Sequence, residues 1–319
     1  MQKISVVVPC YRSGEWLDEL VFGISESLED FSEDWEIILI DDASPDGGST
    51  FREIQRLSKK FSGVRGVRLQ FNVGQFRALM CGLSMSEGDI IVTIDDDLQH
   101  PPDEIPKLIK YLNEHNDIDC VIGKYKSKRH GPIRNLGSKL IGSLLSTVSD
   151  RPKDIVTTSF RAFRKPVKDS IISHKTVRPV MASIVLKSTK KIAYVEVRHS
   201  ERPYGKSGWK FGQMFLATKD LVFNSTTWPL RSFIYVGTIT AILSFLTGGY
   251  MLIRYLGGTI SEPGYTSIML SMLFLGGIQL AGLGMMGEYI DRIISEVQSP
   301  PRWVVAETTP DAGGVSNDS

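Results

Sequence analysis

The residues best suited to chemistry lie at 95–99, where three aspartates are followed by a leucine and a glutamine. They come directly after an apolar run in "IIVTIDDDLQHPPDE" (residues 90–104). Adjacent carboxylates repel one another, so a cation, a helix N-terminus or water must compensate their charge. A hard divalent cation prefers carboxylate oxygens and also bridges the oxygens of a diphosphate. The acidic run therefore indicates a metal and diphosphate site, and a solvated turn is the alternative.

A second acidic pair, Asp41 and Asp42, follows the apolar run 36–40. This run and those at 4–8 and 90–94 lack polar alternation, and segments with helical periodicity separate them. The pattern predicts an α/β fold with a mostly parallel sheet that helices cover on both faces. Ligands of such sheets bind outside the carboxyl ends of the strands. Both acidic clusters are therefore expected at one edge of the sheet.

Segments with helical periodicity supply the predicted cover of the sheet. One face carries Leu17, Leu20, Val21, Ile24 and Leu28, and another carries Phe51, Ile54, Leu57 and Phe61. Pro101 and Pro102 suit a first helical turn, so a helix is expected to begin beside the acidic run. No GxxxxGK[ST] segment is present, and no GxGxxG segment follows a predicted strand. This absence argues against a P-loop or a dinucleotide-binding fold.

The overall composition excludes some partners and favours one compartment. The 319 residues include 37 Lys and Arg against 36 Asp and Glu, a net charge of +1. No global field therefore points to nucleic acid. Cys10, Cys81 and Cys120 lie far apart without metal-binding spacing, which fits a reduced, cytosolic setting. The N-terminus lacks the apolar run and the cleavage site of a secretory signal.

Two uncharged segments, 232–253 and 263–287, follow the α/β part of the chain. Each is long enough to cross a bilayer core of about 30 Å, so they predict a transmembrane hairpin. Two buried helices of a soluble domain are the alternative. Cations are frequent before the first segment, at Lys206, Lys210, Lys219 and Arg231. The connecting loop has only Arg254, which places both termini in the cytoplasm.

The expected domains are a catalytic domain at 1–208, an interfacial segment at 209–230, transmembrane helices within 231–287 and a cytoplasmic tail at 288–319. The segment 209–223 mixes aromatic residues with lysines, as helices in the lipid headgroup layer do, although an ordinary packing helix would also fit. The polar end of the chain, from Glu307, is expected to be disordered.

Several motifs together resemble a known family. They are "VVVPCY", "LIDDASPDGGST", "NVGQFRALMCGL", "DDDLQHPP", "SFRAFR" and "ERPYGKSGWK". In this order, and followed by two apolar segments, they resemble the polyprenyl-phosphate glycosyltransferases of glycosyltransferase family 2. That group includes dolichol-phosphate mannose synthase, bactoprenol glucosyltransferases and the undecaprenyl-phosphate aminoarabinose transferase. The resemblance extends to about residue 304.

The resemblance implies a GT-A (Rossmann-like) catalytic domain, a nucleoside diphosphate sugar as donor, with a UDP-sugar expected, and Mg²⁺ or Mn²⁺ as cofactor. It implies inverting transfer to a polyprenyl phosphate, with undecaprenyl phosphate expected, at the cytoplasmic membrane face, for cell-envelope glycan or lipopolysaccharide modification. It also implies a homo-oligomer in the membrane. The same motifs occur with glucose, galactose, mannose and modified arabinose donors, so they do not define the sugar.

The resemblance also assigns roles to individual positions. The implied metal ligands are Asp95, Asp97 and Gln99. The donor side comprises Pro9, Tyr11, Asp41, Asn72, Asp95 and Asp96. The implied acceptor-phosphate residues are Lys124, Arg134 and Ser138, and the implied catalytic residues are Asp97, Asp154 and Arg202.

The chain departs from the family pattern at a few positions. Arg12 and Ser13 replace the usual Asn-Glu, and Gly208 replaces a lysine after Ser207. A processive polysaccharide synthase, which shares the GT-A core, is the first alternative. Its QxxRW motif has no close match, because "QSPPRW" (298–303) is one residue too long. A non-catalytic membrane scaffold is the second alternative, and retention of the acidic run argues against it.

Overall fold

The computed structural model describes residues 2–29, 31, 34–125, 158–174, 181–200, 228–257, 264–298 and 301–310. The strands are β1 (Ile4–Cys10), β2 (Trp35–Asp41), β3 (Val64–Leu69), β4 (Ile90–Thr93), β5 (Cys120–Tyr125), β6 (Arg161–Arg164), β7 (Ile192–Val197) and β8 (Val305–Thr308). They form one 8-stranded sheet in the order β7-β5-β6-β4-β1-β2-β3-β8.

Strand direction determines which residues meet at the functional edge of this sheet. β1 pairs in parallel with β2 and β4, β2 with β3, and β5 with β7. β6 is antiparallel to β4 and β5, and β8 is antiparallel to β3. The mostly parallel sheet that the sequence predicts is therefore confirmed. Since Cys10 pairs with Asp41, the residues that follow β1 and β2 emerge side by side.

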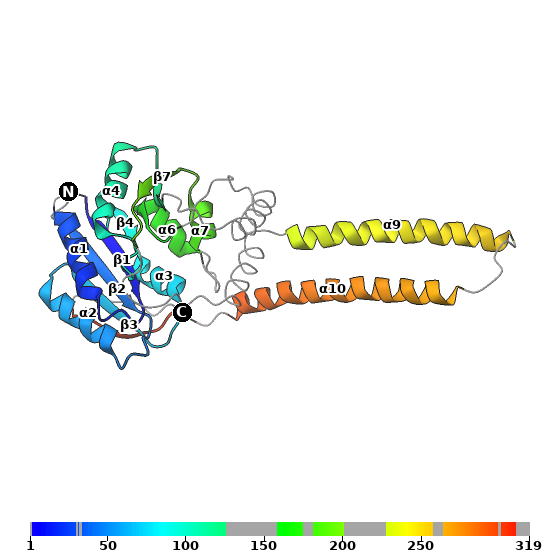
Figure 1. Ribbon diagram of the computed structural model, residues 1–319, viewed down its shortest axis with the longest axis horizontal. Coiled ribbons are helices and arrows are strands. Elements are labelled where there is room, and N and C mark those ends of the chain that lie inside the picture. The colour runs from blue at the N-terminus through cyan, green and yellow to red at the C-terminus, as the bar shows by residue number, and fades with distance from the viewer. Residues whose placement is uncertain are drawn as a thin grey trace.

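Helices cover both faces of the sheet (Figure 1). They are α1 (Leu17–Glu29), α2 (Ser49–Lys60), α3 (Gln75–Met85), η1 (Pro102–Glu104), α4 (Ile105–Glu114), α6 (Lys165–Ser173) and α7 (Met181–Ser188). Buried residues of α1, α2 and α4 pack with Val6 and Val8 of β1. Those of α3, α6 and α7 pack with Val7 on the other face. Burial on both faces explains why the strands lack polar alternation.

Two long helices, α9 (Trp228–Leu256) and α10 (Tyr265–Val297), form a hairpin that extends away from the sheet (Figure 1). A Cβ atom at Gly282 of α10 would lie only 2.3 Å from the Phe233 ring of α9, so glycine permits their close packing. Both helices are longer than the uncharged segments and include charged residues such as Arg254 and Glu288.

Among the described residues, no helix has both the length and the apolar character needed to cross a membrane. That the two segments span a membrane stays a prediction.

After the hairpin, the chain returns to the α/β domain and adds β8 to the edge of the sheet. Trp303 is buried against the core on the α3 face. The Gly66 N–H donates to Thr309 Oγ1 at 3.0 Å, and the Thr309 N–H donates to the Gly66 carbonyl at 2.9 Å. The expectation of disorder from Glu307 is therefore wrong for residues 307–309. Pairing with β3 satisfies their backbone groups, which a polar sequence does not reveal.

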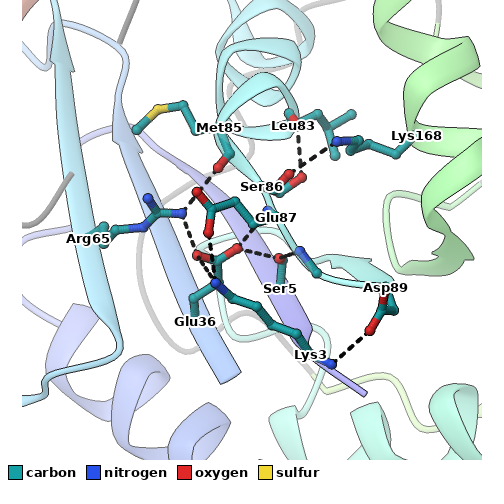
Figure 2. Close-up of polar contacts among 11 residues, drawn as sticks. Lys3, Ser5, Glu36, Arg65, Leu83, Met85, Ser86, Glu87, Asp89 and Lys168 are labelled. Atoms are coloured by element: carbon teal, nitrogen blue, oxygen red, sulfur yellow. Dashed lines mark hydrogen bonds and ion pairs between the residues drawn. The ribbon is translucent and has the colours of Figure 1, made fainter. Parts of the chain in front are cut away.

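A buried carboxylate, Glu36 of β2, organises the edge of the sheet opposite the acidic clusters (Figure 2). The Ser5 hydroxyl and the Glu87 N–H donate to Glu36 Oε1 at 2.5 and 2.8 Å. The Arg65 guanidinium donates to Glu36 Oε2 and to the Met85 carbonyl. Glu36 thereby connects three neighbouring strands to the turn that leads into β4.

Candidate active site

The turn after β4 carries the first aspartate of the acidic run, and two neighbouring segments hold its side chain. Gln75 Nε2, at the start of α3, donates to Asp95 Oδ1 at 2.6 Å. The Ser159 hydroxyl, just before β6, donates to Asp95 Oδ2. Burial raises the pKa of Asp95, and repulsion from Asp97 adds to this rise. Asp95 is therefore oriented by its neighbours within a site that disfavours negative charge.

The third aspartate belongs to a tight turn. The Gln99 N–H donates to Asp97 Oδ1 at 3.1 Å, and Leu98 between them has a φ of 57°. This left-handed conformation is uncommon for leucine, so the surrounding structure must maintain it. The turn therefore presents Asp97 and Gln99 close to Asp95.

These residues fit a hard divalent cation by their chemistry. Within the described part of the chain, no three His, Cys, Asp or Glu side chains are grouped closely enough to bind a metal ion. Asp95 and Asp97 would contribute carboxylate oxygens and Gln99 an amide oxygen, which are ligands that Mg²⁺ and Mn²⁺ accept. Such a cation would also need oxygens from a bound diphosphate, because three protein ligands leave its coordination incomplete.

Asp96, the middle aspartate, connects the acidic turn to the loop after β1. Its Oδ2 accepts the Tyr11 N–H at 2.8 Å, and its backbone carbonyl accepts the Trp16 indole N–H at 2.6 Å. Burial raises the pKa of Asp96 to about 7. Asp96 therefore contacts protein groups that position Tyr11, and its donor-side role stays a prediction.

The carboxyl end of β2 places two buried aspartates beside this loop. The Ser44 N–H donates to Asp41 Oδ1 at 3.0 Å, and Arg68 Nε lies 3.6 Å from Asp41 Oδ2. Asp41 Oδ2 is buried and accepts no hydrogen bond from the described residues. An N–H group of a ligand could therefore donate to this oxygen.

Asp42 fixes the loop between β3 and α3. Its two carboxylate oxygens accept the backbone N–H groups of Val73 and Gly74 at 2.7 and 2.9 Å. Its carbonyl accepts Asn72 Nδ2 at 3.1 Å. Asn72 is therefore held at the end of β2, and the same loop leads into Gln75, which contacts Asp95.

Asp42 gives a testable pH dependence of stability. Burial raises its pKa from 3.8 to about 6. Ionisation thus favours the unfolded chain, and the contribution of Asp42 to stability falls by about 3 kcal/mol as pH rises from 4 through 6. Asparagine does not ionise, so the Asp42→Asn variant does not lose stability in this way as pH rises. We expect the free energy of unfolding of the variant, measured relative to wild type by urea titration, to rise by that amount between pH 4 and 7.5. If the free energies of unfolding of wild type and Asp42→Asn change equally with pH, the raised pKa of Asp42 is contradicted.

The structure describes only some of the other predicted site residues. Pro9 lies within β1, and Lys124 is an exposed residue of β5 paired in register with Glu196 of β7. Arg134, Ser138, Asp154 and Arg202 lie outside the described residues, as does the predicted interfacial segment up to residue 227. Their roles stay predictions.

Sequence reasoning missed several residues that shape the site. Gln75 and Ser159 position Asp95, although each lies within a motif that carries the family resemblance. The sequence placed Asp42 at this edge but did not reveal that it holds the loop before α3. His100 is buried beside the turn, and burial lowers its pKa to about 4, so it is neutral at pH 7. Its place directly after Gln99 in the acidic run was the available signal.

Comparison with known proteins agrees with this geometry. Residues 5–171 match the family described as glycosyl transferase family 2, and residues 228–293 match the GtrB C-terminal hairpin. An undecaprenyl-phosphate 4-deoxy-4-formamido-L-arabinose transferase of Salmonella choleraesuis (strain SC-B67) is 32% identical over 313 residues, which cover 96% of this chain and 94% of the relative. The protein of that name from Salmonella newport (strain SL254) is 31% identical over the same shares.

Among solved structures, the fold is similar to that of glucosyl-3-phosphoglycerate synthase from Mycobacterium tuberculosis, crystallised with Mn²⁺, uridine-diphosphate-glucose and phosphoglyceric acid. The TM-score is 0.50 at 22% identity, and the match covers 69% of this chain and 77% of that one. This likeness supports the GT-A fold. On the sequence matches and this fold, the chain belongs to glycosyl transferase family 2, is a glycosyltransferase and contains a GtrB C-terminal hairpin at residues 228–293.

Proposed function

We propose that the protein transfers a sugar from a nucleoside diphosphate sugar to the phosphate of undecaprenyl phosphate, with inversion at the anomeric carbon. The observation that carries this proposal is the carboxyl edge of the sheet, where the turn after β4 presents Asp95, Asp97 and Gln99, which would hold a cation. Similarity to undecaprenyl-phosphate transferases over nearly the whole chain supports the acceptor.

The reaction needs positioning more than base catalysis. The acceptor phosphate has a second pKa of about 6 and is therefore largely a dianion at pH 7. Its oxygen can attack without a strong base. That oxygen bonds to the anomeric carbon while the bond from this carbon to the diphosphate breaks, and the diphosphate leaves with the electron pair. Mg²⁺ or Mn²⁺, when bound, supplies positive charge to the leaving group.

Protein residues would position both the donor diphosphate and the acceptor phosphate. Asp95 and Asp97 with Gln99 would hold the cation, and Asp41 with Asn72 and Tyr11 would line the nucleoside pocket. We assign Arg202 to the charge of the donor diphosphate, and Lys124, Arg134 and Ser138 to the acceptor phosphate. Asp154 is proposed as a further carboxylate at the reacting centre.

We infer that the hairpin brings the catalytic domain to the lipid that carries the acceptor. α9 and α10 expose many apolar side chains, including Ile239, Leu243, Leu246, Met272, Phe274 and Leu280. Lipid contact would remove this apolar surface from water. Cations concentrated before α9 support a cytoplasmic face for both termini. The implied homo-oligomer stays a prediction.

A processive polysaccharide synthase is less compatible with the structure. In "QSPPRW", the Trp303 ring is buried in the core, and the Arg302 guanidinium lies 4.9 Å from the centre of that ring. Arg302 Nη1 also donates to the carbonyls of Ile172 and His174. These residues attach the C-terminal segment to the catalytic domain, so their contacts explain their presence without a role in polymer synthesis.

The proposal is tested with the full-length protein in detergent, a panel of nucleoside diphosphate sugars and undecaprenyl phosphate. We expect one donor to yield a lipid phosphate whose mass has risen by one sugar residue, with release of nucleoside diphosphate. Undecaprenol, which lacks the phosphate, is the matched control and should give no product. Transfer to undecaprenol, or a sugar polymer independent of lipid phosphate, would contradict the proposal.

A further inference from the structure

Three aromatic side chains pack beside the acidic turn, and we name His100, Tyr125 and His199 the ring cluster. The Tyr125 hydroxyl contacts His100 Nε2, and the ring centroids of these residues are 5.5 Å apart. The His199 ring lies 4.2 Å from Tyr125 and 6.3 Å from His100. Phe160 packs on His100 from the core side at 5.2 Å.

The polar contacts of His100 make this packing specific. Neutral imidazole has one donor and one acceptor nitrogen, and the Tyr125 hydroxyl can bond Nε2 in either tautomer because a hydroxyl both donates and accepts. His100 Nδ1 is buried and has no hydrogen-bond partner among the described residues. Among the described residues, the Tyr125 hydroxyl is therefore the one group that forms a hydrogen bond with the His100 ring.

Each member of the ring cluster lies next to a predicted site residue in the sequence. His100 follows the proposed metal ligand Gln99, and Tyr125 follows Lys124. His199 precedes Arg202 by three positions. The ring cluster thus joins three separate segments of the chain, each of which supplies a different part of the proposed site.

The segment after β7 is also attached to the acidic turn (Asp97–Gln99) by a backbone hydrogen bond and to the following η1 by the charged Arg198 side chain. The Ser200 N–H donates to the Gln99 carbonyl at 3.0 Å. The Arg198 Nε donates to Glu104 Oε1 at 2.6 Å, and its guanidinium also contacts Asp103 of η1. These contacts flank His199 on both sides, so residues 198–200 are held against the acidic turn and η1.

We propose that the ring cluster is a positioning device that sets the acidic turn, Lys124 and residues 198–200 in one relative arrangement. This inference rests on the proposed function, because that function gives Lys124 and Arg202 their roles. The rings need not touch substrate. Their effect is to hold the Asp97–Gln99 turn in the geometry that binds the cation, so small shifts of His100 would weaken that binding.

The test measures Mn²⁺ binding by the full-length protein with uridine diphosphate and without acceptor, from the electron paramagnetic resonance signal of free Mn²⁺. Tyr125→Phe removes one hydroxyl, and His199→Ala removes one ring. We expect each variant to bind Mn²⁺ about tenfold more weakly, because outer contacts of a metal site typically have effects of this size. His199→Phe keeps a ring on Tyr125 and should stay within about threefold of wild type.

Tyr111→Phe is the matched control, because Tyr111 also stacks on a histidine, His115, with centroids 4.1 Å apart, but on α4 outside the site. Its Mn²⁺ binding should equal that of wild type. Wild-type binding by both Tyr125→Phe and His199→Ala would overturn the proposal, even if their melting temperatures fall. If wild type binds Mn²⁺ but transfers no sugar to lipid phosphate, the proposed acceptor is wrong, whereas weaker binding by the variants still supports the ring cluster.

Discussion

Replacing Asp97 with asparagine is expected to lower the transfer rate by about a hundredfold or more at ordinary Mg²⁺ concentrations. In metal sites generally, loss of a contact to a ligand lowers metal affinity or activity by roughly 10–100-fold, and loss of a direct ligand should lower it at least as much. The amide keeps the size of the side chain but removes the negative charge that a hard cation prefers. Raising the Mn²⁺ concentration should restore part of the rate.

The control for this experiment is the same substitution at a surface aspartate. Asp18 of α1 forms exposed ion pairs with Arg56 and Lys60, so Asp18→Asn should leave the transfer rate unchanged. Circular dichroism should show the same fold for both variants. Normal turnover of Asp97→Asn at ordinary Mg²⁺ would show that the cation, if one is used, is held elsewhere.

The choice of Asp97 over Asp96 as a proposed metal ligand comes from the family resemblance, and the structure adds contacts that distinguish the two side chains. Three identical side chains in a row do not by themselves indicate which of them faces a ligand. The left-handed Leu98 and the contact from Asp96 to the Tyr11 N–H separate the two carboxylates, and both features depend on packing between β1 and β4. The acidic run alone therefore predicted where the site lies but not how its members divide their roles.

In the sheet, local apolar runs predicted some strands, whereas other strands depend on pairing with segments distant in sequence. Uninterrupted apolar runs predicted β1, β2 and β4 and their common carboxyl edge, because burial on both faces leaves a local signature. The antiparallel strand β6 and the C-terminal strand β8 had no such signature, since each is short and pairs with a segment distant in sequence. The loop-holding role of Asp42 was missed for a related reason, because its partners lie beyond the next strand.

The second large effect concerns the edge of the sheet opposite the active site. Glu36→Gln is expected to lower the free energy of unfolding by about 3–5 kcal/mol, the range for removing one partner of a buried ion pair. The amide keeps the shape of the side chain but leaves the largely buried Arg65 guanidinium without its counter-charge (Figure 2). Its NH₂ group also cannot accept the Ser5 or Glu87 donors if it occupies the Oε1 position.

Urea unfolding followed by circular dichroism measures this loss, and Glu114→Gln is the matched control. Glu114 forms an exposed pair with Lys110 at 3.8 Å, so its replacement should change stability by less than about 1 kcal/mol. Because Glu36 lies at the amino ends of the strands, the folded Glu36→Gln protein should keep wild-type KM values for both substrates. A stability equal to that of Glu114→Gln would mean that solvent screens the Glu36 pair, and altered KM values would mean that the two edges of the sheet are coupled.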